Sequence, residues 1–301
     1  MTAVRRLEWD GAPPRSGPRR LATSFGLAVL FAMLYAVAVG VVLGLLAGPL
    51  TALVGRTGQH VRIDELLSLV AVLAATAVML RSVDRRAWSD VGLSRDAARV
   101  GRFVAGGCLG AAPIALASGA LLLIGWLVVV PTQAGSSLAA GLRISVFLLP
   151  AALHEEVLCR GYLLTVIRDS VGVTGAVVST SVLFGLLHLA NADATAESVL
   201  VVILAGLFLA AIRVVFDSLY AAWAAHFAWN WVMAVPLHAP VSGLRLEAPD
   251  YRTVSAGPAW ITGGGWGPEG GAAAALGMIA ALAYLHARHR RVQPRPGREE
   301  S

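Results

Sequence analysis

The stretch ISVFLLPAALHEEVLCRGYLLTVI, residues 144–167, places two carboxylates and a guanidinium inside an apolar run long enough to cross a bilayer. Glu155 and Glu156 are adjacent, and Arg160 follows Glu156 by four residues. On insertion scales, each charged residue at the centre of a span costs about 2.5–3.5 kcal/mol, so such residues usually face a protein interior or a water cavity. The stretch therefore predicts a membrane helix that carries a functional site.

The composition extends this prediction to the whole chain. Of its 301 residues, 57% are hydrophobic and only 14% are charged, whereas a soluble domain carries about a quarter charged residues. We predict an all-α, polytopic transmembrane helical bundle of about eight spans, because a membrane barrel would show short alternating segments instead. The predicted spans are 25–46, 64–81, 103–130, 142–168, 172–190, 197–215, 218–236 and 271–287.

The arginines predict how these spans are oriented. The chain has no lysine, and most of its 24 basic residues lie in the two tails and in the link between the second and third spans. Because cytoplasmic segments carry the excess of positive charge, we expect both termini in the cytoplasm. We predict a disordered tail at 1–20, an integral membrane domain at 21–288 and a basic tail at 289–301, in a bacterial cell membrane. This charge pattern does not indicate a nucleic-acid partner.

Two of the connections carry their own expectations. The link 82–102 is expected to form either a short interfacial helix or a solvated loop. The long link 237–270 is rich in glycine and proline, so it is expected to be a turn-rich loop on the non-cytoplasmic side. Within the spans, two sets of glycines recur every four residues and predict close helix packing. These sets are Gly40, Gly44 and Gly48, and Gly106 and Gly110.

Helical geometry separates the roles of the charged residues in the opening stretch. Glu156 and Arg160 are four apart, so they share a helical face and can pair. Glu155 is rotated by about 100° from Glu156 and must face elsewhere. A carboxylate that points into a water-poor site suits a general base or acid. The neighbouring His154 has no evident partner in the sequence, and we expect it to be structural.

Two further spans contribute polar groups. The motif FGLLH ends in His188, and the motif HFAWN begins with His226 and ends with Asn230 on the same helical face. A water held between Glu155 and His188 could be deprotonated to attack a carbonyl carbon. His226 and Asn230 could donate hydrogen bonds to the oxyanion that forms. Together these groups predict a peptide-hydrolysis site.

Other interpretations of the same residues stay open. Glu155, His188 and His226 could be zinc ligands, but the HExxH helix is absent and Asn230 suits oxyanion binding better. We therefore expect no cofactor and prefer metal-free catalysis over a zinc-dependent version. Cys159 could be a nucleophile, although a buried cysteine is usually inert. The polar groups could also only fix helix packing in a non-catalytic immunity or scaffold protein, or relay protons in a transporter.

The three motifs resemble those of a known family. EEVLCR fits the pattern EExxxR, FGLLH fits FxxxH, and HFAWN fits HxxxN. In this order and on separate predicted helices, they resemble the CAAX prenyl protease and bacteriocin-processing (CPBP, or Abi) family, which includes the type II CAAX prenyl endopeptidases. The resemblance covers about residues 100–236. The loop WITGGGWGPEGG also looks like a loop of some bacterial members.

The resemblance implies an intramembrane glutamic endopeptidase, of a family often described as metalloproteases. The implied partners are the lipid bilayer and a membrane-embedded or lipid-modified peptide or protein substrate. Bacterial relatives are linked to peptide maturation, bacteriocin immunity and membrane-protein regulation. The implied site residues are Glu155 and His188 for water activation, His226 and Asn230 for the oxyanion hole, and Glu156 and Arg160 as support.

Overall fold

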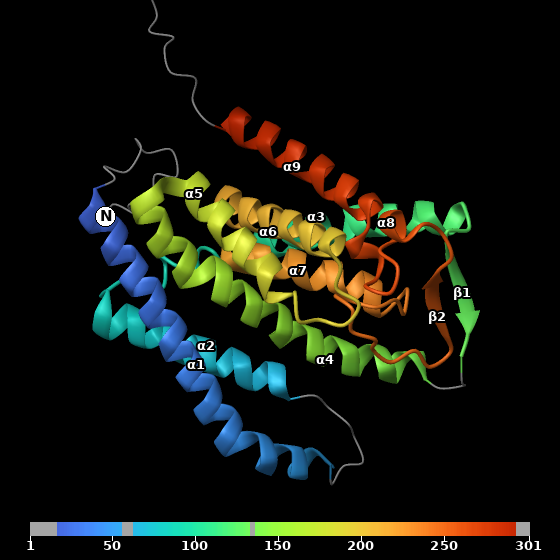
Figure 1. Ribbon diagram of the computed structural model, residues 1–301, viewed down its shortest axis with the longest axis horizontal. Helices are drawn as coiled ribbons and strands as arrows, with labels where there is room; N and C mark the ends of the chain where they lie inside the picture. Colours follow the sequence, from blue (N-terminus) through green and yellow to red (C-terminus); the bar gives the residue numbers. More distant parts are fainter. Residues whose placement is uncertain (1–16, 56–62, 133–135, 293–301) are drawn as a thin grey trace, which may run out of the picture.

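The structure, a computed structural model, describes residues 17–55, 63–132 and 136–292. It is a bundle of long helices with a small two-stranded sheet at one end (Figure 1). The predicted all-α class is confirmed, although the sequence did not predict the sheet. In chain order, the elements are α1 (Pro18–Gly55), α2 (Asp64–Val78), α3 (Val100–Leu123), β1 (Leu127–Pro131), α4 (Ser137–Glu156), α5 (Leu164–Leu187), α6 (Ala196–Phe216), α7 (Leu219–Ala234), β2 (Tyr251–Ser255), α8 (Ala259–Thr262) and α9 (Ala272–Val292).

Five helical segments within the described part of the chain are long and apolar enough to cross a membrane. The apolar part of α9, Ala272–Arg288, is shorter, and α7 has only 16 residues. These helices indicate a membrane protein, while the predicted count of eight spans stays a prediction. The qualifying segments are Pro18–Leu53, Asp64–Val83, Val100–Leu123, Ser137–Leu187 and Ala196–Phe216.

The 51-residue segment Ser137–Leu187 is not one straight helix. At Gly172 the backbone has φ +76° and ψ 176°, which lies outside the helical region and suits a residue without a Cβ. An unbroken helix of 51 residues would be about 77 Å long, more than twice the roughly 30 Å of a bilayer core. The break lies at the start of the predicted fifth span, so this boundary follows from the sequence.

The predicted third span, 103–130, is wrong at its C-terminal end. Helix α3 stops at Leu123, and the valine-rich run Leu127–Pro131 forms strand β1 instead. Strand β1 pairs antiparallel with β2, and Val129 lies opposite Thr253. From sequence alone, a short apolar run can be either the end of a membrane helix or a strand. The β-branched valines favour the strand once a partner strand is present. That partner comes from the long loop, about 120 residues further along the chain.

The link after α2 is folded without an interfacial helix. A π-helical turn, Met79–Val83, is followed by turns up to the start of α3. Val91 is completely buried there, and Trp88 packs against the same cluster. The interfacial-helix alternative is therefore wrong, because turns replace the helix and Val91 is buried in the protein, although Val100 is exposed at the start of α3.

The glycine prediction holds on α3 and fails on α1. A Cβ built on Gly110 would lie 1.9 Å from the carbonyl oxygen of Ala225 on α7, and Gly106 is nearly as close to the same helix. Helices α3 and α7 therefore pack backbone against backbone. On α1, which lies at the edge of the bundle in Figure 1, nothing is within 4 Å of a Cβ on any of the three glycines, Gly40, Gly44 and Gly48.

The predicted tail boundaries also shift. Helix α1 begins at Pro18 and α9 runs to Val292, so the inner ends of both predicted tails are helical. The remaining tail residues, 1–16 and 293–301, lie outside the described residues. Figure 1 shows α1 beginning and α9 ending toward the same end of the bundle, away from the sheet. Their cytoplasmic location stays a prediction.

Candidate active site

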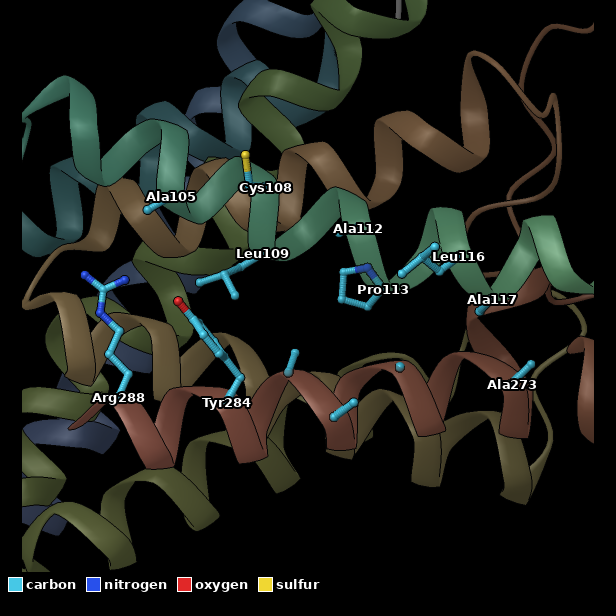
Figure 2. A pocket seen from close by; sticks show the side chains of 13 residues that line it. Ala105, Cys108, Leu109, Ala112, Pro113, Leu116, Ala117, Ala273, Tyr284 and Arg288 are labelled. Atoms are coloured by element: carbon cyan, nitrogen blue, oxygen red, sulfur yellow. The ribbon is translucent and has the colours of Figure 1, made fainter. Parts of the chain in front are cut away.

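The four predicted reactive residues lie around one cavity in the bundle. Glu155 is near the end of α4, His188 caps the C-terminus of α5, and His226 and Asn230 are one turn apart on α7. All four line a cavity of about 480 Å³. An apolar groove of about 510 Å³ between α3 and α9 contains none of them (Figure 2). The candidate site is therefore the polar cavity.

The helix carrying the carboxylates changes its winding directly after them. Helix α4 ends at Glu156 and continues as a π-helical turn, Val157–Leu163. Within this turn, Gly161 has φ −83° and ψ −112°, which is not helical. Single π-turns inside helices are frequent at functional sites, where they re-aim side chains. Here the turn separates the end of α4 from the start of α5.

Glu156 and Arg160 form the pair that their spacing predicts. Arg160 Nη1 donates to Glu156 Oε1 at 3.0 Å, and both side chains are completely buried. Arg160 Nη2 also donates to the Gly206 carbonyl oxygen at 3.3 Å, and its guanidinium lies 4.1 Å from the centre of the Phe184 ring. The guanidinium is thus held by three partners. Glu156 and Arg160 form a buried ion pair that supports the site from behind.

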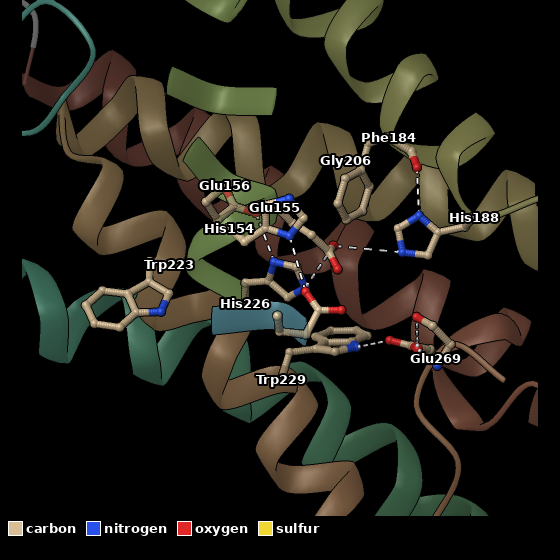
Figure 3. Close-up of polar contacts among 12 residues, drawn as sticks. His154, Glu155, Glu156, Phe184, His188, Gly206, Trp223, His226, Trp229 and Glu269 are labelled. Carbon is tan, nitrogen blue, oxygen red and sulfur yellow. Dashed lines mark hydrogen bonds and ion pairs between the residues drawn. The ribbon is translucent and has the colours of Figure 1, made fainter. Parts of the chain in front are cut away.

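His226 lies between the Glu156–Arg160 ion pair and Glu155 (Figure 3). Its Nδ1 lies 2.9 Å from Glu156 Oε1, and its Nε2 lies 3.8 Å from Glu155 Oε2. Because a carboxylate that is paired with an arginine can only accept, Nδ1 of His226 carries the proton and donates it to Glu156. Glu156 therefore orients the imidazole, a contact that the sequence did not predict.

His188 faces Glu155 from the other side. Its Nδ1 donates to the Phe184 carbonyl oxygen at 2.7 Å, since a carbonyl oxygen can only accept. A neutral His188 then presents a lone pair at Nε2, which lies 3.9 Å from Glu155 Oε2. This distance is too long for a direct hydrogen bond, and two acceptors cannot bond to each other. A molecule with two donor hydrogens, such as water, would link them.

Glu155 has an unsatisfied oxygen at the centre of the arrangement. Among the described residues, its buried Oε2 has no hydrogen-bond donor, although both imidazole Nε2 atoms lie within 4 Å. A buried polar atom without a partner costs about 1–3 kcal/mol, and in a native structure it calls for an explanation. The side chain as a whole is 32% exposed through its other atoms, so the carboxylate borders the cavity although Oε2 itself is buried.

A loop residue that was not predicted from the sequence, Glu269, borders the site. Glu269 lies in the glycine-rich loop and is only 9% exposed. Its Oε2 accepts from Trp229 Nε1 at 2.9 Å, and its Oε1 accepts from the Ser242 backbone N–H at 2.5 Å and hydroxyl at 2.8 Å. Trp229 directly precedes Asn230, so Glu269 fastens the loop to α7 beside the site (Figure 3). The only signal in the sequence is one carboxylate among glycines.

The same loop is held to α4 at the protein surface. Arg143, in the first part of α4, donates to Glu247 through Nε at 2.8 Å and Nη2 at 2.5 Å. These hydrogen bonds hold the pKa of Glu247 below its ordinary value. Besides the pairing of β2 with β1, the loop is therefore attached through a buried carboxylate at Glu269 and an exposed one at Glu247.

Two other residues considered from the sequence also lie at this cavity. His154 has partners after all, because Tyr35 Oη lies 2.5 Å from its Nε2 and Glu65 Oε2 lies 3.3 Å from its Nδ1. Both partners come from helices distant in sequence, which is why spacing alone did not reveal them. Cys159 lines the cavity but has no exposed surface.

The expectation of metal-free catalysis stays a prediction. Across the described ranges, no three His, Cys, Asp or Glu side chains are grouped so that they could hold a metal ion. Glu155, His188 and His226, the zinc set considered from the sequence, converge without forming such a group.

The comparisons with known proteins address part of this arrangement. Residues 136–232 match the family model described as Type II CAAX prenyl endopeptidase Rce1-like. The resemblance predicted from the sequence is thus confirmed over this range, which contains all six predicted site residues. Glu65, Tyr35 and Glu269 lie outside it. No curated protein and no solved structure matched the chain.

Proposed function

We propose that this protein is an intramembrane endopeptidase that hydrolyses a peptide bond of a membrane-embedded or lipid-modified peptide or protein. The observation that carries the proposal is the buried Oε2 of Glu155, which lies 3.9 Å and 3.8 Å from the Nε2 atoms of His188 and His226 and has no donor among the described residues. The match of residues 136–232 supports the protease class.

The nucleophile in this proposal is a water held by Glu155 and His188. Both present acceptors, so one water can donate its two hydrogens to Glu155 Oε2 and His188 Nε2 and keep a lone pair for attack. As its oxygen bonds to the carbonyl carbon, one O–H bond breaks and the proton passes to Glu155. The carbonyl oxygen takes the electron pair and becomes the oxyanion.

His226 and Asn230 are proposed to stabilise that oxyanion. Asn230 offers its amide N–H, and His226 offers Nε2–H when both of its nitrogens are protonated. The contact of Nδ1 with Glu156 stabilises this cation. The charges then balance, since the two carboxylates are matched by Arg160 and the imidazolium. Glu156 and Arg160 are positioning residues, because they act through His226.

Collapse of the intermediate completes the proposed reaction. The proton held by Glu155 passes to the leaving nitrogen, the C–N bond breaks, and the products are an amine and a carboxylic acid. Glu155 returns to its ionised form and can bind the next water. One carboxylate thus serves as base and then as acid, so no second acid is required.

The proposal is tested by comparing membrane peptides from cells that carry the wild type, Glu155→Gln or Glu247→Gln. We expect a set of cleavage products in the wild type and in the surface control Glu247→Gln, and their loss in Glu155→Gln at equal protein level. Identical peptide profiles in all three strains would overturn the proposed activity. The same experiment identifies the substrate.

We also propose that the reaction needs no metal. The test is the metal content of the purified protein, followed by activity on the identified substrate before and after chelation. We expect less than one metal ion per chain and activity that survives chelation. Stoichiometric zinc together with loss of activity on chelation, restored by adding zinc back, would overturn the metal-free mechanism.

A further inference from the structure

The catalytic cavity contains a second polar cluster that the proposed reaction does not use. Tyr35 from α1, Glu65 from α2 and His154 from α4 all line the cavity that contains Glu155. His154 lies between the other two, 2.5 Å from Tyr35 Oη and 3.3 Å from Glu65 Oε2. Because His154 directly precedes Glu155 in the chain, this cluster lies next to the reacting groups.

The hydrogen atoms of the cluster follow from what each group can donate. A carboxylate only accepts, so Nδ1 of His154 donates to Glu65. The neutral imidazole then accepts at Nε2 from the Tyr35 hydroxyl, and each of the three groups has a suitable partner. His154 therefore orients the carboxylate of Glu65. Its side chain stays 28% exposed, so a ligand in the cavity can reach it.

The charges on the cavity wall favour one kind of ligand. The wall carries the carboxylates of Glu65 and Glu155 against one proposed cation, the His226 imidazolium, and none of the described residues lining it is an arginine. The sequence has no lysine, and the charge of Arg160 is buried behind Glu156. An anionic group beside Glu65 would be repelled by its carboxylate, whereas a cationic nitrogen there would form a charge-assisted hydrogen bond with it.

We propose that Glu65 is a specificity-determining residue that binds a cationic nitrogen of the substrate close to the cleaved bond. That nitrogen belongs to a lysine or arginine side chain or to a free amino terminus. Tyr35 and His154 are positioning residues that fix the carboxylate. This inference rests on the proposed protease function and names its substrate class: peptides with a positive charge within a few residues of the bond that Glu155 attacks.

The test uses the purified full-length protein in lipid vesicles and fluorogenic peptides that carry an apolar anchor. Lysine, acetyl-lysine or glutamate is placed in turn at each of about four positions on either side of the cleaved bond. At one of these positions we expect lysine to raise kcat/KM about 10-fold or more over acetyl-lysine, the size of a hydrogen bond to a charged group. Glu65→Gln should lose this preference, and the surface variant Glu247→Gln should keep it.

A second arm distinguishes the two sources of the cation. The same peptides are compared with free and with acetylated amino termini. A preference that follows the terminal amine assigns Glu65 to the amino terminus, and one that follows lysine at an internal position assigns it to a side chain. A wild type that cleaves lysine, acetyl-lysine and glutamate peptides equally well would overturn the inference, as would an unchanged preference in Glu65→Gln.

Binding separates this inference from the proposed reaction. In the Glu155→Gln background, the lysine peptide should bind about 10-fold tighter than its acetyl-lysine counterpart, and the additional change Glu65→Gln should remove the difference. Equal binding of the two peptides would overturn the inference even if no peptide is cleaved. If cleavage requires Glu155 but its rate and lysine preference are the same in Glu65→Gln, this inference alone is overturned. Cleavage that survives Glu155→Gln would overturn the proposed protease.

Discussion

Replacing Glu269 with glutamine should release the glycine-rich loop from the site. The wild-type carboxylate is only 9% exposed and accepts three hydrogen bonds, one from Trp229 and two from Ser242. Glutamine keeps one acceptor oxygen. If that oxygen faces Ser242, the new NH₂ group meets the indole N–H of Trp229, donor against donor. One hydrogen bond is then lost, and the other two lose their ionic character.

The size of the effect follows from these bonds. A hydrogen bond to a charged group contributes about 1.5–3 kcal/mol and a neutral one about 0.5–1.5 kcal/mol, so the two weakened bonds lose about 2 kcal/mol together. The unpaired indole N–H costs about 1–3 kcal/mol more. Because contributions of neighbouring groups do not simply add, we expect a net loss of about 2–4 kcal/mol. This corresponds to about 30-fold to 700-fold more frequent opening of the loop.

Hydrogen exchange measures this opening directly. The Ser242 amide donates to Glu269 and the Gly243 amide donates to the Trp266 carbonyl, so peptides covering 237–271 should lose protection in Glu269→Gln. The matched control is Glu247→Gln, which removes an exposed carboxylate from the same loop and should change protection little. Unchanged exchange in Glu269→Gln, or an equal change in both variants, would refute this account of the loop.

Two further predictions concern stability in detergent. Gly110→Ala should lower the free energy of unfolding by about 1–3 kcal/mol, because its Cβ would lie 1.9 Å from a carbonyl oxygen of α7. Gly44→Ala, where nothing lies within 4 Å, should not, so equal unfolding midpoints for the two variants would contradict the packing of α3 on α7. Arg160→Met should cost about 3–5 kcal/mol, because it removes the guanidinium that pairs with the fully buried Glu156. A wild-type unfolding midpoint in Arg160→Met would show that this pair does not support the fold.

The sequence predicted the parts of the site that depend on one helix at a time. The pairing of Glu156 with Arg160 follows from a four-residue spacing, and the same rule puts His226 and Asn230 on one face. Glu155 points in another direction than Glu156 because consecutive residues of a helix are rotated by about 100°. Such relations are set by helical geometry, which tertiary structure changes little.

Contacts between distant segments could not be predicted in this way. Glu269 reaches Trp229 only because the long loop folds back over α7, and Glu65 reaches His154 only because α2 packs beside α4. The same limit explains the errors. The run Leu127–Pro131 is a strand because β2 is present, and the α1 glycines lack a partner because no described helix packs closely on that face.

The most direct test of the central claim, that Glu155 activates the attacking water, is the turnover of the purified Glu155→Gln variant. It should be measured against the wild type, on a substrate identified from the membrane peptides, at saturating concentration and with unfolding midpoints recorded for both proteins. The claim predicts that kcat falls about 10²-fold to 10⁴-fold, the contribution of a general base, while the midpoint shows that the variant is folded. A folded Glu155→Gln protein that cleaves the substrate at a rate within a few-fold of the wild type would contradict it.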